Sequence, residues 1–259
     1  MIARTVFALV LLLGAGGAHA TTTDELIAKN IAARGGADRL AAIKTLKMRG
    51  QLVAGGGFKL AYAELLKRPD KIRDEASMQG LTQVQAWDGQ RGWSIQPFGG
   101  RKDPIPMSAD DARELAEGAD IDGAWIDAAA KGNTVTYLGT EDVDGTNAHK
   151  LQVQLKDGNT LVVYLDPDAY LPIREIARRT VRGTQQVTQT DFGDYEQVNG
   201  VYFPFAITSG PKGGTPDQMM QITISKAEAN VPVEDALFAF PEKKIAAGSA
   251  ATVAGQGSK

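Results

Sequence analysis

The feature that most constrains this chain is an alternation of apolar and polar residues with a period of two, which recurs in short segments from Thr45 to Ala229. A period of two is typical of β-strands with one buried and one exposed face. Asp-Gly and Asn-Gly pairs separate many of the segments, as tight hairpins require. Strands are predicted at 45–53, 58–67, 70–77, 81–87, 91–97, 133–138, 147–156, 159–166, 172–181, 184–195, 201–208 and 218–229.

These segments predict a mainly β fold of the α+β kind. Their connections are too short for crossover helices, so the sheet must be mostly antiparallel, and about a dozen strands in one meander must curl or close. Helical spacing predicts two N-terminal helices at 23–33 and 37–44. A helical pair is predicted between the two halves of the meander, one helix capped by Ser108 and another over Asp120 to Ala130.

The two ends of the chain differ from this pattern. Residues 1–20 contain Arg4, an apolar run and an Ala-His-Ala site, which predict a cleaved secretory signal peptide. No cysteine follows the site, so we expect a periplasmic protein that is not lipidated. Residues 246–259 are rich in Ala, Gly and Ser and predict a disordered tail, which leaves 21–245 as one domain.

Composition excludes several function classes. The absence of cysteine excludes thiol nucleophiles and Cys-ligated metals, and a net charge of −3 argues against a nucleic-acid partner. His149 is the one histidine beyond the predicted signal peptide, so metal catalysis and a Ser-His-Asp triad are not expected. We predict no catalytic residues, no metal and no cofactor. A hydrolase that uses Asp166 and Asp168, or His149, stays open as an alternative.

Some strands are apolar on both faces, which an antiparallel sheet permits only where both faces are covered. Residues 161–165 are the clearest case. The cover can be an ordinary side-chain core, or an apolar pocket between a curved sheet and the inserted helices.

Three groups of motifs, taken in order, resemble the LolA-like family of periplasmic lipoprotein and lipid carriers. The first group has Arg68-Pro69 with Ile72-Arg73, followed by the Trp87 to Pro97 hairpin. The second runs from Tyr164 through Asp191-Phe192-Gly193 to Asn199-Gly200-Val201-Tyr202-Phe203-Pro204, and the third is the exit from Asn230 to Pro241. The resemblance covers most of residues 21–245.

This resemblance implies a half-open antiparallel barrel of about 11–12 strands, with the inserted helices as a lid over an apolar cavity for acyl chains. By motif position it implies that Arg68 contacts the lid. Trp125, on the second inserted helix, and Trp87 and Trp93, on the sheet, are candidates for the lining. The full set of predicted cavity residues is Leu60, Tyr62, Trp87, Trp93, Ile95, Trp125, Leu151, Val153, Leu155, Val163 and Phe203.

The function that these observations favour is a periplasmic carrier that moves an acyl lipid or lipoprotein towards the outer membrane without chemistry. Its implied partners are the cargo, an inner-membrane donor protein and an outer-membrane acceptor protein, with transient membrane contact. We expect a monomer. The alternative from another class is a periplasmic sensor or interaction module that docks a membrane-protein partner, with lipid as a signal.

Overall fold

The computed structural model describes residues 21–241, so the predicted signal peptide and the predicted disordered tail lie outside the described residues. It contains three α-helices and thirteen β-strands within that range. The helices are α1 (Thr23–Ala33), α2 (Ala37–Ala42) and α3 (Ala109–Gly118). The strands are β1 (Thr45–Ala54), β2 (Phe58–Lys67), β3 (Lys71–Met78), β4 (Leu81–Trp87), β5 (Gly92–Gln96), β6 (Arg101–Pro106), β7 (Thr134–Val143), β8 (Thr146–Gln154), β9 (Thr160–Leu165), β10 (Pro172–Val181), β11 (Thr184–Val198), β12 (Val201–Pro211) and β13 (Met220–Ala229).

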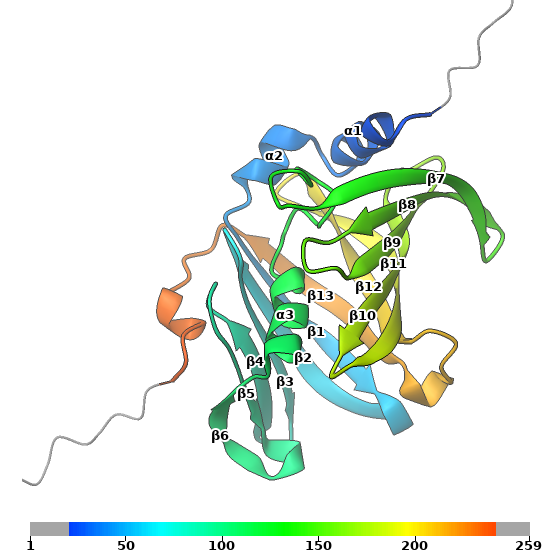
Figure 1. Ribbon diagram of the computed structural model, residues 1–259. Helices are drawn as coiled ribbons and strands as arrows, with labels where there is room; N and C mark the ends of the chain where they lie inside the picture. The colour runs from blue at the N-terminus through cyan, green and yellow to red at the C-terminus, as the bar shows by residue number, and fades with distance from the viewer. Residues whose placement is uncertain (1–20, 242–259) are drawn as a thin grey trace, which may run out of the picture.

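All thirteen strands form one antiparallel sheet in the order β6-β5-β4-β3-β2-β1-β13-β12-β11-β10-β9-β8-β7. We call β1–β6 the N-terminal wing and β7–β13 the C-terminal wing. The wings meet at a seam where β1 pairs with β13, for example Leu46 opposite Ala229. The sheet is curved and open, as Figure 1 shows, so the predicted half-barrel is confirmed.

The strand order dictates what covers the concave face. β6 and β7 follow each other in the chain but form opposite edges of the sheet. The chain between them, residues 107–133, must therefore pass from one wing to the other, and it does so across the concavity (Figure 1). We call residues 107–133 the crossing segment.

The first half of the crossing segment is the helix α3, which lies against β3, β4 and β5. Ser108 caps it by accepting a hydrogen bond from the Asp111 amide, and Asp110 and Asp111 suit the positive end of the helix dipole. A close approach is possible because β5 carries Gly92, where a Cβ would lie 2.8 Å from the Cβ of Ala112. The helix therefore depends on a glycine beneath it.

The second half, residues 119–133, corrects one prediction, because the helix expected over Asp120 to Ala130 does not form. The segment is a series of turns joined largely by bonds between residues three apart, such as Gly123 to Asp120 and Ile126 to Gly123. Gly123 and Asp127 have φ angles of 89° and 52°, so the chain twice leaves the right-handed helical region. Trp125 is consequently on a turn and not on a helix.

Sequence analysis also missed β6 and placed some strand ends too early. Residues 101–106 read Arg-Lys-Asp-Pro-Ile-Pro, without an apolar alternation and with two prolines. Proline is tolerated there because β6 is the edge of the sheet, where one side of the backbone needs no partner. β7 and β11 extend to Val143 and Val198, beyond the expected 138 and 195.

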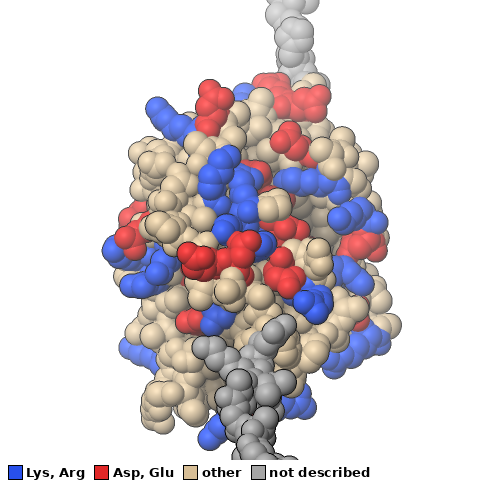
Figure 2. Space-filling view, turned by 90° about the vertical axis from the view of Figure 1, so that its left-hand side faces the viewer, with Lys and Arg blue, Asp and Glu red and all other residues tan. Residues whose placement is uncertain are grey.

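No helix in residues 21–241 combines the length and the apolar character that crossing a membrane requires. On the side of the molecule shown in Figure 2, Lys and Arg side chains are interspersed with Asp and Glu. That face therefore has no extended surface of one charge sign.

Candidate functional site: the cavity beneath the crossing segment

The concave face and the crossing segment enclose a cavity of about 890 Å³. Its walls come from both wings, from the crossing segment and from Arg34 at the end of α1. Apolar side chains from distant parts of the chain share it, among them Leu66, Trp125 and Ile207. Ligand pockets for small organic molecules usually measure about 300–1,000 Å³, so this cavity lies in the upper part of that range.

The predicted cavity residues fall into three groups. Four of them line the cavity: Trp87, Trp125, Leu155 and Phe203. Five belong to the apolar core cluster that includes the cavity wall, but do not line it: Leu60, Tyr62, Leu151, Val153 and Val163. The remaining two, Trp93 and Ile95, lie in a separate cluster.

The structure places Trp93 and Ile95 away from the cavity because successive residues of a strand face opposite sides. They pair with Ala86 and Val84 on the convex face, whereas Trp87 faces the cavity. The C-terminal segment after β13 covers this convex patch. The Trp93 indole, only 1% exposed, donates a 2.7 Å hydrogen bond to the Phe238 carbonyl.

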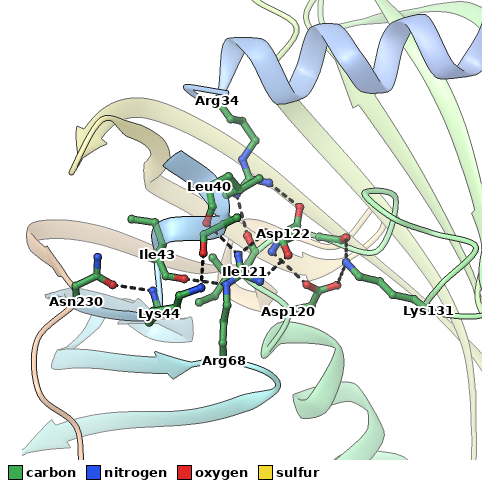
Figure 3. Close-up of polar contacts among 12 residues, drawn as sticks. Arg34, Leu40, Ile43, Lys44, Arg68, Asp120, Ile121, Asp122, Lys131 and Asn230 are labelled. Carbon is green, nitrogen blue, oxygen red and sulfur yellow. Dashed lines mark hydrogen bonds and ion pairs between the residues drawn. The ribbon is translucent and has the colours of Figure 1, made fainter. Parts of the chain in front are cut away.

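Arg68 fastens the second half of the crossing segment to the N-terminal wing (Figure 3). Its Nη1 and Nη2 atoms donate to the two carboxylate oxygens of Asp122 at 2.6 and 2.5 Å. Its remaining donors reach the carbonyls of Ile43 and Leu40, at the end of α2. Burial raises the pKa of Asp122, but the Arg68 hydrogen bonds and charge outweigh it and hold that pKa below its usual value. The resemblance had implied a lid contact for Arg68, and the structure places it against the crossing segment.

Arg34 holds the same segment from α1. It is 8% exposed, and its Nη1 and Nη2 atoms donate to the carbonyls of Asp122 and Ile121 at 2.6 and 2.9 Å. Figure 3 shows the guanidinium pointing down from the helix end toward the Asp122 backbone. Sequence analysis did not identify Arg34, because its partners are backbone groups that no motif encodes.

Further contacts complete the fastening. The Trp125 indole donates to the Asn30 side chain at 3.1 Å, and Asn30 is fully buried. Lys131 donates to Asp120 at 2.6 Å and to the Gly123 carbonyl at 2.9 Å. We call residues 119–133 with these bonds the pinned half of the crossing segment.

The α3 half reaches the C-terminal wing through several polar contacts. Arg113 is 3.7 Å from Asp157, and the Arg182 amide donates to Asp110 at 2.9 Å. The most buried of these contacts is made by Arg179. Arg179 on β10 donates from Nη2 to Glu117 on α3 at 2.5 Å, and Glu114 is 3.7 Å from its Nη1. Burial raises the pKa of Glu117 although Arg179 opposes that shift. Both residues line the cavity, and sequence analysis missed both.

The cavity wall also carries carboxyl groups that the sequence did not reveal. Glu64 on β2 lies directly across the strand pair from Asp74 on β3. Glu175 on β10 lines the cavity, and burial raises its pKa to about 7. The sequence contains a signal that could have identified these residues, because each is an acidic residue at an inward position of an alternating strand.

The groups considered for hydrolysis lie in structural settings. Asp166 Oδ1 accepts hydrogen bonds from the amides of Asp168 and Ala169, which forms the turn after β9. The His149 ring stacks on Tyr170, and Tyr137 is 3.1 Å from its Nδ1. Within residues 21–241, no three His, Cys, Asp or Glu side chains gather in a way that could hold a metal ion.

Comparison with known proteins finds similarity at the level of structure. No protein-family model and no curated sequence matches the chain. A DUF1329 family protein from Desulfovibrio piger is similar with a TM-score of 0.59 at 12% identity, over 85% of this chain and 98% of the other. A LolA superfamily protein from Nitrosomonas europaea is similar with a TM-score of 0.57 at 13% identity, over 85% and 98% of the two chains.

A putative outer membrane lipoprotein-sorting protein domain from Vibrio parahaemolyticus is also similar, with a TM-score of 0.55 at 11% identity. It covers 83% of this chain and 95% of that domain. At such identities the likeness concerns the fold. The chain has a LolA-like fold.

Proposed function

We propose that this protein is a periplasmic carrier that holds the acyl chains of a lipid or lipoprotein in the cavity beneath the crossing segment. The observation that carries the proposal is the cavity itself, about 890 Å³ between an open sheet and a segment that spans it. The LolA-like fold supports it, since one structural neighbour is described as a lipoprotein-sorting domain.

The energetics of acyl chains favour a carrier of this design. Each CH₂ group moved from water into an apolar site contributes about 0.8 kcal/mol, so burial alone can hold a chain. Trp87, Trp125 and Phe203 supply large apolar surfaces on the cavity wall. In this proposal the cargo comes from an inner-membrane donor and passes to an outer-membrane acceptor.

The crossing segment supplies a means of loading. Polar contacts such as Arg68 with Asp122 tie it to the sheet together with buried apolar side chains such as Trp125. The polar contacts can be exchanged for water when the segment moves. Loading then requires a shift of the crossing segment while the sheet keeps its shape.

The test is mass spectrometry of an organic extract from protein purified out of a periplasmic fraction without detergent. Acyl lipid in stoichiometric amount is the expected result, and it would also identify the cargo class. A protein that is empty, and that also fails to bind a neutral fluorescent amphiphile, would overturn the carrier function. Recovery of a membrane protein in its place would favour the sensor module.

A further inference from the structure

The cavity has an acidic interior, which a simple apolar container does not need. Glu64 and Glu175 line it, one on each wing. Asp74 lies directly beside Glu64 on the neighbouring strand. Buried carboxyl groups are costly unless they are paired, so their presence calls for a partner.

On the N-terminal wing, the three polar groups are linked to one another. Tyr62 Oη donates to Glu64 Oε2 at 2.9 Å, and Asp74 lies opposite Glu64 in the register of β2 and β3. Burial and the neighbouring Glu64 raise the pKa of Asp74 well above its usual value, and burial raises the pKa of Glu64 as well. Its Oδ1 atom is buried and has no hydrogen-bond partner among the described residues.

On the C-terminal wing, Glu175 stands between Val163 and Thr190 in the register of the sheet. Thr190 is already bonded to Ser209 at 2.9 Å. The structure gives the Glu175 carboxyl group no hydrogen bond or ion pair within residues 21–241, although Arg179 and Glu117 are near enough to affect its pKa. The group is enclosed by protein and faces the cavity.

The buried cations beside the cavity are already engaged. Arg179 is paired with Glu117, Lys131 with Asp120, and Arg34 donates to two backbone carbonyls. Arg113 and Lys156 also line the cavity, where Arg113 is paired with Asp110 and Lys156 is exposed. At Glu64 and Glu175 the wall therefore offers carboxyl oxygens that accept hydrogen bonds. A phosphate or carboxylate cargo group would meet like charges there, whereas an ammonium group would meet acceptors.

We propose that the acidic wall of the cavity, with Glu64 on one wing and Glu175 on the other, is a subsite that attracts the amine group of an amphiphilic cargo. This proposal rests on the proposed carrier function, because the apolar part of the same molecule occupies the rest of the cavity.

The test compares matched single-chain ligands that share a dodecyl chain and differ in the head group: dodecylamine, dodecanol and laurate. Each displaces the neutral reporter N-phenyl-1-naphthylamine from the intact protein, below its micelle concentration. We expect dodecylamine to bind about tenfold more tightly than laurate, because one favourable charge interaction of about one pKa unit corresponds to that ratio. Laurate that binds as tightly as dodecylamine would overturn the subsite and leave the carrier function standing.

Butylamine separates an amphiphile site from a site for free amines. It lacks the long chain, so we expect it not to displace the reporter at concentrations where dodecylamine does. Displacement by butylamine at equal concentration would overturn the amphiphilic nature of the ligand. If no dodecyl compound and no reporter binds, both this subsite and the carrier function fail.

Variants test whether Glu64 and Glu175 cause the preference for dodecylamine over laurate. Glu175→Gln and Glu64→Gln are each expected to reduce the amine-over-laurate ratio by about threefold or more, since each removes a negative charge from the wall. Glu196→Gln on β11, where the residue is exposed, makes the same chemical change outside the cavity and should leave the ratio unaltered. A ratio that is unchanged in both cavity variants would contradict the assignment.

Calorimetry gives an independent readout. Near pH 7 the Glu175 carboxyl group is partly protonated, and a bound ammonium would favour its charged form. Binding of dodecylamine should therefore release protons, seen as a dependence of the binding heat on the ionisation enthalpy of the buffer. Dodecanol should show no such release, and equal release for both ligands would contradict the proposal.

Discussion

The two halves of the crossing segment are attached to the molecule in different ways. The α3 half is a regular helix that packs on β3–β5 and meets the C-terminal wing through the Arg179–Glu117 pair and through more exposed contacts that involve Arg113 and Arg182. The pinned half has little regular structure, but Arg34, Arg68 and Trp125 all bond it to the sheet side or to α1. Regular secondary structure is therefore not what fixes this segment in place. We expect the helix to move at smaller cost than the pinned half, because several of its polar contacts to the C-terminal wing are exposed to solvent.

The largest effect is expected from Trp125→Ala, in the pinned half. The side chain is 8% exposed and lines the cavity, so its removal should lower the free energy of unfolding by about 3–5 kcal/mol. Urea unfolding followed by circular dichroism measures the change. Trp125→Phe retains most of the packing and loses only the hydrogen bond to Asn30, so it should lower the free energy of unfolding by less than Trp125→Ala does. A loss below about 1 kcal/mol for the alanine variant would show that this half is held by its polar bonds alone.

The next effect concerns pH at Glu175 on β10, next to the Arg179–Glu117 pair that joins the α3 half to the C-terminal wing. Burial raises the pKa of Glu175 to about 7 in the folded protein, so the native state binds more protons than the unfolded chain between the unfolded pKa and that value. Stability should therefore fall as pH rises through this window, by roughly 3 kcal/mol at about 1.4 kcal/mol per pKa unit. Glu175→Gln should remove the fall and be the more stable protein at alkaline pH. Parallel pH–stability curves for the two proteins would refute this.

The pinned half should respond to pH in the opposite direction. Burial raises the pKa of Asp122, but the hydrogen bonds and charge of Arg68, with the charges of Lys131 and Arg34, together lower it further, so these contacts stabilise the fold above the unfolded pKa. That stability is lost as pH falls through the lower, folded value. Arg68→Gln should cost about 1–3 kcal/mol near neutral pH, and the difference should shrink in acid. Arg91→Gln, at an exposed site, serves as the control.

The smallest effect on stability is expected from Glu117→Gln, at the ion pair of the α3 half. Because burial raises the Glu117 pKa despite Arg179, the charged pair gives little net stabilisation, and we expect a loss below about 1 kcal/mol. Entry of N-phenyl-1-naphthylamine, followed by stopped-flow fluorescence, should nevertheless become faster. If reporter entry is unchanged in Glu117→Gln but faster in Arg68→Gln, the pinned half is the mobile half of the crossing segment, contrary to our expectation.

Much of the fold could be predicted because alternation and turn residues are local signals. The strands on either side of Asp157-Gly158 are examples, with the hairpin and both strands near their expected positions. The pinned half could not be predicted in the same way. Its sequence from Asp120 to Ala130 has helical composition, and tertiary bonds to Arg34 and Arg68 favour turns over that preference.

The candidate site was predicted less completely than the fold. Trp87 and Phe203 were placed in the cavity by their apolar character, but the same reasoning misplaced Trp93, whose strand position faces the convex side. The acidic wall was not predicted, because the cavity lining was inferred from apolar residues alone. Glu64 and Glu175 show that an inward polar residue in an alternating strand is more informative about a site than another leucine.

The seam between β1 and β13 has a consequence for the order in which the molecule forms. Each wing consists of hairpins between neighbouring strands, which can form as the chain emerges, but the seam joins Leu46 to Ala229 across nearly the whole described sequence. Contacts between such distant residues are slow to form, because the intervening chain must first be ordered. The two wings can thus exist before the cavity does, and the cavity appears only when the last strand docks on the first.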